Sequence, residues 1–424
     1  MSPSATQPSP SAGFRRIPLS YNNAESETSA LRLIYALCPG WENEEGEVMF
    51  ERFTDGITNT LLKATKKRPG LNEVQIDEEA VLLRAYGHNT DILIDREKEA
   101  TSHALLSEHQ LAPHLLARFQ NGLLYRFIRG RACASSDLSR EAVWRGVARK
   151  LGQWHACLPI VSTAPSVVPQ ENDQSLSLST SGLKDKNSDN AVLEMMANIA
   201  PGKAQPNPWS VMQKWILALP ANTQTERERK ETLQRELERT STELYKVPTL
   251  GEDGLVFSHC DLLSGNVIIE PPASGAGLPD TVETISFVDY EYATPSPAVF
   301  DIANHFAEWG GLECDYNVLP TRSQRKEFLG EYFRSYSTHL GSPGDDEEEI
   351  QRLFDQVDLF RGVPGLYWGI WALIQATISQ IDFDYAKYAE NRLGEYWAWR
   401  AETDGSREKA GKEKPLRERR WAEA

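Results

Sequence analysis

Alternating apolar and polar positions mark the first third of the chain and predict an antiparallel sheet. Turn signals at Asp55-Gly56, Gly87 and Asn121-Gly122 separate the apolar runs. Such alternation is typical of strands with one buried face. The predicted strands lie in Val48–Phe50, Thr60–Leu62, Val81–Tyr86, Asp91–Ile94 and Leu123–Ile128. Helical spacing of apolar residues predicts one main helix in this region, Glu97–His109, with Pro113 beyond its end.

Helical spacing dominates the rest of the chain. The predicted helices lie in Glu141–Leu158, Trp209–Leu217, Arg227–Tyr245 and from Pro297 to about Trp399, while short strands return between Leu255 and Asp289. A chain of 424 residues exceeds what one hydrophobic core usually supports. We therefore predict an α+β protein of two lobes, a small N-terminal lobe with the sheet and one main helix, and a larger, mostly helical C-terminal lobe.

Compositional shifts predict the boundaries of these parts. Residues 1–15 are Ser/Pro-rich and are expected to be a disordered leader, and 162–190 are rich in Ser, Asn and Asp and are expected to be a flexible insertion. The mixed charges of 401–424 predict a disordered tail. The N-terminal lobe then spans 16–128 and the C-terminal lobe 129–400.

Charge and composition exclude several classes of function. A formal net charge of -16 argues against binding along nucleic-acid phosphates, which needs concentrated Lys and Arg. No apolar run approaches the roughly 20 residues that span a bilayer. The five cysteines are scattered without metal-ligand spacing and are expected to be reduced thiols, and the leader lacks the features of a signal peptide. These features favour a cytoplasmic protein that binds a small ligand.

Polar residues of catalytic type lie between two apolar runs in the segment 255–269. His259, Asp261 and Asn266 have the His-x-Asp-x4-Asn spacing of kinase catalytic loops, in which the Asp orients the acceptor hydroxyl and the Asn binds magnesium. Asp289 ends a second apolar strand. Antiparallel pairing of Val267–Ile269 with Ser286–Val288 would place Asn266 opposite Asp289, and Mg²⁺ prefers such oxygen ligands. The structural alternative is a polar turn without catalytic function.

Several segments resemble the choline/ethanolamine kinase family, part of the protein-kinase-like group. They are FTDGITNTLLKA at 53–64, VLLRAYG at 81–87, TDILIDREKEA at 90–100, SHCDLLSGNVII at 258–269, FVDYEYATPSPAVFDIANHFAEWGG at 287–311 and YWGIWALIQATISQIDFDYAKYAENRLGEYW at 367–397. Together they cover most of 45–155 and 205–400. The motifs DGITN, ILIDRE and CDLLSGN are more similar to the ethanolamine branch.

The resemblance implies a reaction and its partners. An enzyme of this branch uses ATP and Mg²⁺ to phosphorylate the hydroxyl of ethanolamine, giving phosphoethanolamine and ADP at the first step of CDP-ethanolamine phosphatidylethanolamine synthesis. Choline, alone or beside ethanolamine, is the alternative acceptor. Another small-molecule kinase and an inactive kinase-like scaffold are further alternatives. A homodimer is compatible with the sequence, which does not fix the oligomeric state.

The N-terminal lobe carries the expected ATP contacts. Gly56, Thr58 and Asn59 lie in a turn whose backbone N–H groups would approach phosphates, although a plain hairpin turn is the alternative. Arg84 lies inside an apolar run, where an unpaired cation would be costly to bury. In kinases, the corresponding cation pairs with the ATP phosphates and with a helix glutamate, so we expect the phosphates and Glu99 to be the partners of Arg84. The alternative is that Arg84 is a strand residue whose side chain faces solvent.

The hinge is identified through the resemblance. Phe127 and Ile128 correspond to the family's hinge, which binds adenine through backbone groups. Arg126 stands where the family pattern would have an acidic or amide residue, so side-chain roles at the hinge are left open.

The acceptor residues follow from aromatic spacing and from the resemblance. Trp368 and Trp371 share one face of a predicted helix, a pattern that core packing also produces. The resemblance assigns these two residues and Tyr388 to the walls of a pocket for a cationic head group, whose charge is attracted to ring faces. Glu308 is the expected carboxylate for the ammonium, and Tyr292 is expected to reach the acceptor.

Overall fold

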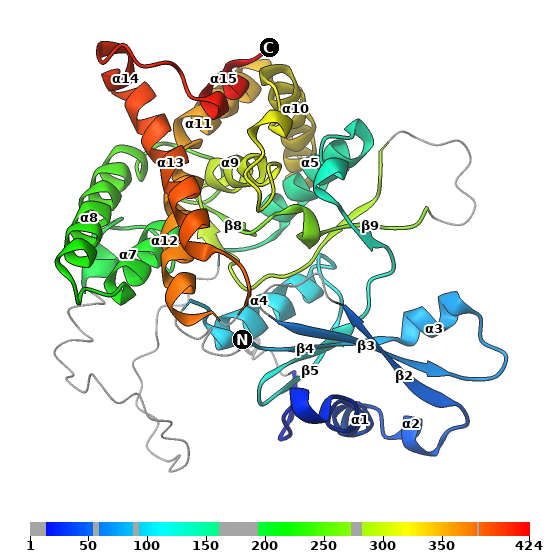
Figure 1. Ribbon diagram of the computed structural model, residues 1–424. Helices are drawn as coiled ribbons and strands as arrows, with labels where there is room; N and C mark the ends of the chain where they lie inside the picture. The colour runs from blue at the N-terminus through cyan, green and yellow to red at the C-terminus, as the bar shows by residue number, and fades with distance from the viewer. Residues whose placement is uncertain (1–13, 54–58, 88–92, 161–193, 273–281, 380) are drawn as a thin grey trace, which may run out of the picture. The chain divides into compact units, whose positions relative to one another are not determined.

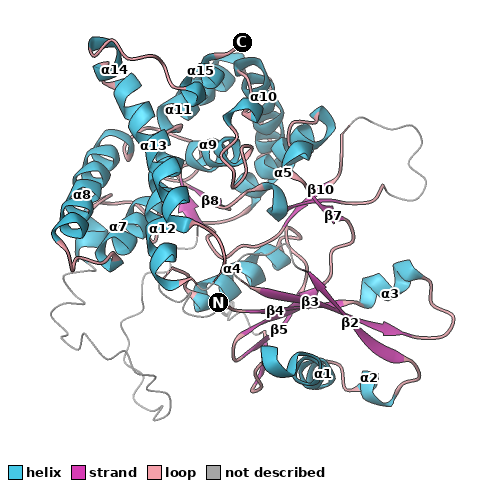
Figure 2. Cartoon of the chain, in the orientation of Figure 1, coloured by secondary structure: helices cyan, strands magenta, loops and turns pink. Residues whose placement is uncertain are grey.

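The computed structural model describes residues 14–53, 59–87, 93–160, 194–272, 282–379 and 381–424 (Figure 1). The predicted insertion at 162–190 and all but the end of the predicted leader lie outside these ranges. The chain divides into two compact units. Unit 1 comprises Met1–Arg131, Ile268–Gly275 and Ser286–Glu291, and unit 2 comprises Ala132–Val267, Ala276–Ile285 and Tyr292–Ala424. The predicted α+β fold class is confirmed, with most strands in unit 1 and most helices in unit 2 (Figure 2).

A six-stranded sheet forms the centre of unit 1. Its order is β1 (Arg15–Ile17), β5 (Leu115–Phe119), β6 (Gly122–Arg126), β4 (Val81–Ala85), β3 (Thr60–Lys67) and β2 (Glu47–Phe53). All of its pairings are antiparallel except that of β1 with β5, which is parallel. The strands of the predicted antiparallel sheet pair as expected, and the parallel edge is formed by β1, which was not predicted and which includes residue 15 of the predicted leader. Strand β4 is central, with Arg84 between Leu61 and Leu123.

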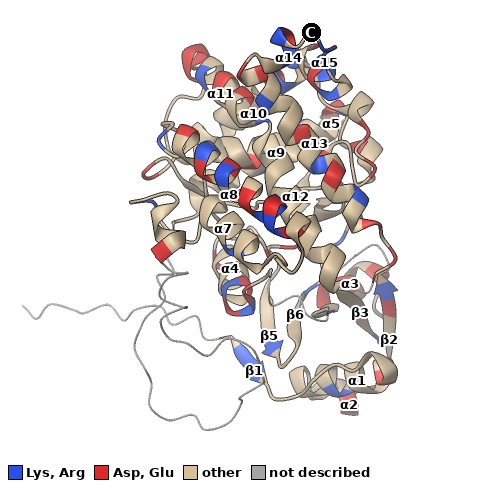
Figure 3. Cartoon of the chain, turned by 60° about the vertical axis from the view of Figure 1, so that its left-hand side comes forward, with Lys and Arg blue, Asp and Glu red and all other residues tan. Residues whose placement is uncertain are grey.

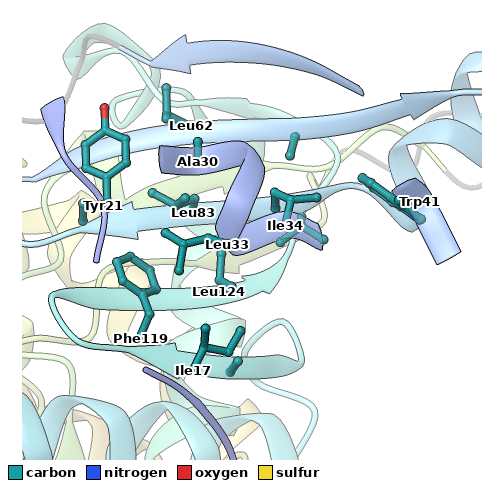
Figure 4. Packing of buried hydrophobic residues seen from close by; sticks show 14 residues of the cluster. Ile17, Tyr21, Ala30, Leu33, Ile34, Trp41, Leu62, Leu83, Phe119 and Leu124 are labelled. Carbon is teal, nitrogen blue, oxygen red and sulfur yellow. The ribbon is translucent and has the colours of Figure 1, made fainter. Parts of the chain in front are cut away.

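Helix α1 (Ser26–Leu37) was absent from the sequence prediction, although its signal was present. Ala30, Leu33 and Ile34 have helical spacing and are fully buried. Figure 4 shows their side chains gathered with Leu83 and Leu124 of the sheet. This lobe therefore contains α1 and α3 (Glu73–Glu79) in addition to the predicted main helix.

Helix α4 (Arg96–Glu108) matches the main helix predicted for the N-terminal lobe. It begins after Asp95, whose side chain accepts hydrogen bonds from the N–H groups of Glu97 and Lys98, both at 3.1 Å. The strand predicted at Asp91–Ile94 is wrong in its described part, because Leu93 lies in a turn and Ile94 in an irregular segment that leads into the cap. Residues 91 and 92 lie outside the described residues.

Unit 2 is built mainly from helices. They are α5 (Glu141–Cys157), α7 (Pro208–Ala218), α8 (Gln224–Leu244), α9 (Ala298–Glu308), α10 (Arg322–His339), α11 (Glu347–Phe360), α12 (Val363–Ile378), α13 (Tyr385–Thr403), α14 (Ser406–Lys409) and α15 (Leu416–Ala422). Strand β8 (Val256–Ser258) pairs antiparallel with β11 (Thr294–Ser296).

A further small sheet has the order β10 (Ile285–Phe287), β9 (Val267–Ile269) and β7 (Arg131–Ala132). The strand that precedes Asp289 and the strand that follows Asn266 are therefore neighbours, as expected.

Helices α12 and α13 approach each other closely because glycines line their contact. A Cβ atom on Gly365 would lie 2.6 Å from the backbone oxygen of Arg392, and one on Gly369 would lie 2.7 Å from the side chain of Leu393. Such distances leave no room for a larger residue. The close approach fixes the position of α13, which carries Tyr388 and Arg392.

Helix α8 has a charged, exposed face and a buried apolar face. Arg, Lys and Glu are spread along it in Figure 3, while Leu233, Leu237 and Leu244 are buried. Its N-cap Thr223 accepts a hydrogen bond from Glu226, which completes a capping box. In the part of the chain that the structure describes, no helix combines the length and apolar character needed to cross a membrane.

The prediction of a disordered tail at 401–424 is wrong. This segment contains the end of α13 and helices α14 and α15. Trp421 is 4% exposed, and its indole nitrogen donates to Asp358 Oδ1 at 2.6 Å. The mixed charges of the tail predicted a solvated chain, but Arg417 and Trp421 are four residues apart and form a buried face of α15.

Lys66 provides a test of the packing in unit 1. Its side chain is buried in β3, and its ammonium donates to the carbonyl oxygens of Trp41, Glu44 and Gly46 at 2.6, 3.0 and 2.8 Å. We predict that Lys66→Met lowers the free energy of unfolding by about 3 kcal/mol, because carbonyls in contact with the ammonium lose their donor. Urea unfolding measures the loss. Lys67→Met, at the exposed neighbouring position, is the control; an equal loss there would contradict the prediction.

Candidate active site

One face of helix α9 holds the backbone of the loop that contains Asp261. Asp301 accepts hydrogen bonds from the N–H groups of His259, at 2.9 Å, and Cys260, at 2.7 Å. His155 of α5 lies 3.0 Å from the same carboxylate, and its other ring nitrogen lies 2.8 Å from the hydroxyl of Tyr332. Asp301 therefore braces the loop backbone.

Two further residues of the same face complete this support. Asn304 donates to the carbonyl of Cys260 at 2.9 Å, and His305 Nδ1 lies 2.8 Å from the carbonyl of Leu262. With Asp301 they have i, i+3, i+4 spacing, which puts all three on one side of the helix. The loop needs such side-chain partners because it lies between strands and has no ladder of its own. Cys260 has a positive φ of 63°, a conformation that surrounding contacts must maintain.

Burial and hydrogen bonding determine the charges of Asp301 and His305. Burial by itself would raise the pKa of Asp301, but hydrogen bonds from His155 and the backbone outweigh it and hold the pKa below its usual value. Burial lowers the pKa of His305 to about 4, so this imidazole is neutral at pH 7 and donates through Nδ1 to Leu262. The brace is thus one anion surrounded by donors.

Asp261 and Asn266 lie together as the sequence spacing predicts. Asn266 donates through its amide nitrogen to the backbone oxygen of Asp261 at 2.8 Å and to its carboxylate at 3.1 Å. Asp261 is 7% exposed. Because the amide nitrogen faces Asp261, the amide oxygen of Asn266 is the atom suited to a metal ion.

In unit 1, Arg84 is surrounded by carboxylates. Its guanidinium lies 2.7 Å from Asp289 Oδ1 and 3.4 Å from Glu99 Oε1, and it also donates to Glu291. The partner predicted on α4, Glu99, is therefore in place. Asp289 differs from the others because its side chain is 29% exposed and its φ is positive, at 66°.

Arg96 completes this cluster and was not among the predicted residues. Its Nη1 lies 2.9 Å from Glu99 and 3.2 Å from Glu291. Asn59, a predicted phosphate contact, donates to Glu291 at 3.3 Å. Arg96 directly precedes the predicted helix Glu97–His109, and this position next to Glu99 was the one signal in the sequence for a second buried cation. Its contact with Glu291 is a tertiary contact that the sequence does not show.

The cluster carries more negative than positive charge. Three carboxylates, Asp289, Glu291 and Glu99, face the two guanidinium groups of Arg84 and Arg96. Burial raises the pKa of Glu99, and burial together with the charge of Asp289 raises the pKa of Glu291, while Arg84 opposes both shifts. An added cation would relieve this excess.

The donor set fits Mg²⁺. Among the described residues, no group of three or more His, Cys, Asp and Glu side chains has the arrangement of a metal site. Mg²⁺ does not need one, because it is usually bound by one or two protein oxygens with substrate phosphates and waters. Asp289 and Asn266 supply a carboxylate and an amide oxygen. They belong to different units, so their joint binding of one ion remains a prediction.

The predicted aromatic residues of the acceptor side form a connected group in unit 2. The rings of Trp368 and Trp371 lie edge to face at 5.5 Å, and Tyr292 lies 5.5 Å from Trp368. The indole nitrogen of Trp371 donates to the hydroxyl of Tyr292 at 2.8 Å. Trp368 donates to Asn304 at 2.7 Å, so the aromatic group and the Asp261 loop share a supporting residue.

Glu308 and Tyr388 meet at Arg392, which the sequence analysis did not single out. Arg392 donates to Glu308 at 2.6 Å and to the hydroxyl of Tyr388 at 2.8 Å. Burial raises the pKa of Glu308, Arg392 opposes the rise, and Glu395 adds to it. The predicted acceptor carboxylate is therefore part of a buried ion pair. Glu308 and Arg392 lie on different helices, so no local sequence motif indicates this pair.

The structure describes only some of the other predicted ATP contacts. Gly56 and Thr58 lie outside the described residues. The ring of Phe127 stacks on Phe53 at 6.3 Å, and the backbone N–H of Phe127 donates to Ala80 at 3.1 Å, so that N–H is already used. Ile128 follows it and is half-buried. Arg126, the departure from the family pattern, donates to the carbonyl of Glu79 at 2.6 Å.

We predict that Asp301→Asn destabilises the protein by roughly 3 kcal/mol at pH 7, because an amide cannot accept all the donors that meet the carboxylate. The folded-state pKa of Asp301 lies below its unfolded value, so its stabilisation is present above about pH 4 and is lost as the pH falls through the folded-state pKa. Urea midpoints from pH 7 to pH 3 should therefore converge. Asp345→Asn, at a side chain that is 90% exposed, is the control. A pH-independent difference would contradict the prediction.

Comparison with known proteins places these residues in a family. Residues 50–397 match the family model described as choline/ethanolamine kinase. Ethanolamine kinase 1 of Mus musculus is 30% identical over 380 residues, which cover 88% of this chain and 89% of the relative. Ethanolamine kinase 2 of Homo sapiens is 31% identical over 371 residues, which cover 87% of this chain and 80% of the relative.

Solved structures share the fold. An ethanolamine kinase from Plasmodium vivax is similar with a TM-score of 0.63 and 24% identity, over 88% of each chain. A choline kinase from Cryptosporidium parvum is similar with a TM-score of 0.57 and 19% identity, over 89% of this chain and 97% of the other. The family model matches most of the sequence, and the chain therefore belongs to the choline/ethanolamine kinase family.

Proposed function

We propose that this protein is an ethanolamine kinase that transfers the terminal phosphoryl group of ATP to the hydroxyl of ethanolamine, giving phosphoethanolamine and ADP. This reaction opens the CDP-ethanolamine route to phosphatidylethanolamine. The observation that carries the proposal is the braced loop, in which Asp261 and Asn266 are held together in a chain of this kinase family. The curated relatives described above, both named ethanolamine kinases, support ethanolamine as the acceptor.

Asp261 is proposed to orient the acceptor hydroxyl and to take its proton late in the transfer. A carboxylate suits this role because phosphoryl transfer depends on positioning and on electrostatics more than on covalent chemistry by the protein. The amide of Asn266 fixes the carboxylate from one side. The brace from Asp301 fixes the backbone on which Asp261 stands, through the N–H groups of the two preceding residues.

The ATP side is proposed to consist of a metal pair and a phosphate clamp. Asn266 and Asp289 would hold Mg²⁺, which neutralises phosphate charge when bound. Arg84 would steady the phosphates while Glu99 holds its guanidinium in place. Backbone groups at Gly56, Thr58 and Asn59 would meet the phosphates. The carbonyl of Phe127, whose N–H is bonded to Ala80, and the backbone groups of Ile128 would meet the adenine. The excess negative charge around Arg84 supports a cation at Asp289.

The acceptor ammonium is proposed to lie against aromatic rings and a carboxylate. Trp368, Trp371, Tyr292 and Tyr388 offer ring faces, to which a cation is attracted. Rings alone replace the water of a primary ammonium poorly, because its N–H groups need acceptors. Glu308 supplies such an acceptor. A trimethylammonium group has no N–H to donate, so the aromatic group suits choline as well, while the carboxylate favours ethanolamine.

We predict that Asp261→Asn lowers kcat for phosphoethanolamine formation by about a thousandfold, because the amide cannot accept the hydroxyl proton. The affinity for Mg²⁺·ATP should change by less than about twofold, since Asp261 is assigned to the acceptor. Steady-state kinetics and equilibrium titration with a non-hydrolysable ATP analogue measure the two quantities. Asp345→Asn, at an exposed carboxylate, should match the wild type.

Two outcomes count against different parts of this account. Phosphoethanolamine formation that persists in folded Asp261→Asn would show that the base is assigned wrongly. A wild-type protein that binds ATP but produces no phosphoethanolamine would overturn the proposed function itself.

A further inference from the structure

A row of buried charges runs from the proposed acceptor carboxylate to the helix at the C-terminal end of the described chain. Its members alternate in sign: Glu308, Arg392, Glu395, Arg417, Glu418 and Arg361. The side chains of the first five are 1–3% exposed, and Arg361 is 18% exposed. Helices α9, α13 and α15 of unit 2 and the residue that follows α11 contribute to the row, which we call the ion row.

The first half of the ion row links α9 to α13. Arg392 Nη2 lies 2.6 Å from Glu308 Oε1, and Arg392 Nη1 lies 3.4 Å from Glu395 Oε2. One guanidinium therefore serves two carboxylates on different helices. The shorter contact is the one to Glu308, and the longer one is the i, i+3 pair within α13.

The second half links α13 to α15. Arg417 Nε lies 3.6 Å from the same Oε2 atom of Glu395, and Arg417 Nη1 lies 2.9 Å from Glu418. Glu418 in turn lies 3.0 Å from Arg361, and Arg417 donates to the backbone oxygen of Arg361 at 2.5 Å. Arg417 is thus held on both sides and presents a second cation to Glu395.

Helix α15 is anchored independently of these charges. Trp421 packs edge to face against Phe306, with ring centroids 6.2 Å apart, and Phe306 lies two residues before Glu308 in α9. The guanidinium of Arg325 lies 3.9 Å above the Trp421 ring and also donates to the Trp421 carbonyl. Figure 1 shows α15 beside α11, where Trp421 donates to Asp358. Arg417 therefore stands on a firmly placed helix.

Charge balance makes Arg392 depend on Arg417. A buried carboxylate that loses its cation is strongly unfavourable, so Glu395 competes with Glu308 for Arg392. Cys314 and Tyr316 also face Glu395, but burial raises the pKa of both groups and they stay neutral at pH 7. Arg417 satisfies Glu395 from the other side. Without Arg417, Arg392 would be drawn toward Glu395 and away from Glu308.

We propose that Arg417 is a positioning residue of the acceptor site: by pairing with Glu395 it keeps Arg392 on Glu308 and so fixes the carboxylate that receives the acceptor ammonium. This inference rests on the proposed function, because that function assigns Glu308 to the acceptor. All members of the ion row belong to unit 2, whereas the charge cluster around Arg84 belongs to unit 1. The effect should therefore fall on the acceptor and spare ATP.

The test is the kinetics of Arg417→Gln. We expect KM for ethanolamine to rise about tenfold, a size that such networks can transmit, while KM for ATP and kcat at saturating ethanolamine change by less than about twofold. Glu308→Gln serves as the reference and should raise the same KM. Arg419→Gln, at an exposed arginine of the same helix, is the matched control and should leave all three constants unchanged.

Two more variants separate positioning from folding. Arg417→Lys keeps a cation near Glu395 and should recover part of the loss in KM, because a point charge replaces the fork incompletely. The double variant Arg417→Gln/Glu418→Gln removes one charge of each sign and should reproduce the rise in KM with a melting temperature closer to that of the wild type. If the single variant fails to fold, this double variant decides the question.

The outcomes distinguish this inference from the proposed function. A wild type without ethanolamine kinase activity overturns the function. If the wild type is active and Glu308→Gln raises KM, but folded Arg417→Gln or the double variant has the KM of Arg419→Gln, only the inference is overturned. A parallel decline of kcat and both affinities with melting temperature, and no recovery in Arg417→Lys, would show that Arg417 acts on folding alone.

Discussion

The carboxylate of Asp301 is the interaction on which the proposed catalytic loop depends. It is fully buried, and it receives the N–H groups of His259 and Cys260 and the ring of His155. Its negative charge is kept because these donors replace water. The loop depends on the same hydrogen bonds for its shape because no strand ladder is available to it. The residue after these two is Asp261. The position of the proposed base therefore depends on a carboxylate that binds the loop backbone.

Two charge clusters with different balances show how this fold uses buried ions. In unit 1, three carboxylates, including the partly exposed Asp289, face the guanidiniums of Arg84 and Arg96, which leaves an excess of negative charge. In unit 2, the ion row has as many cations as anions. An unbalanced cluster is ready for an added cation, whereas a balanced one holds its members in place. The cluster around Arg84 fits the proposed binding of metal and nucleotide, and the ion row fits the proposed positioning of Glu308.

Local spacing explains what the sequence could predict. The pattern of His259, Asp261 and Asn266 is contained in one loop, and Asp301, Asn304 and His305 lie on one helical face, so their grouping follows from geometry alone. Arg392 and Arg417 were missed because the pairs that give them their proposed roles, Arg392 with Glu308 and Arg417 with Glu395, join different helices. The tail at 401–424 was misread since its charges look solvated until the pairs of the ion row are formed. Helix α1 is a different case, because its apolar spacing was visible in the sequence.

A competition between ethanolamine and choline measures directly which acceptor the site prefers. Wild-type protein is incubated with Mg²⁺·ATP in limiting amount and with ethanolamine and choline at equal concentration, and the phosphorylated products are separated by ³¹P NMR. The ratio of the products gives the ratio of the specificity constants. A carboxylate that accepts N–H groups predicts an excess of phosphoethanolamine of about tenfold or more. An excess of phosphocholine, or the absence of both products, would contradict the assignment of this site to ethanolamine.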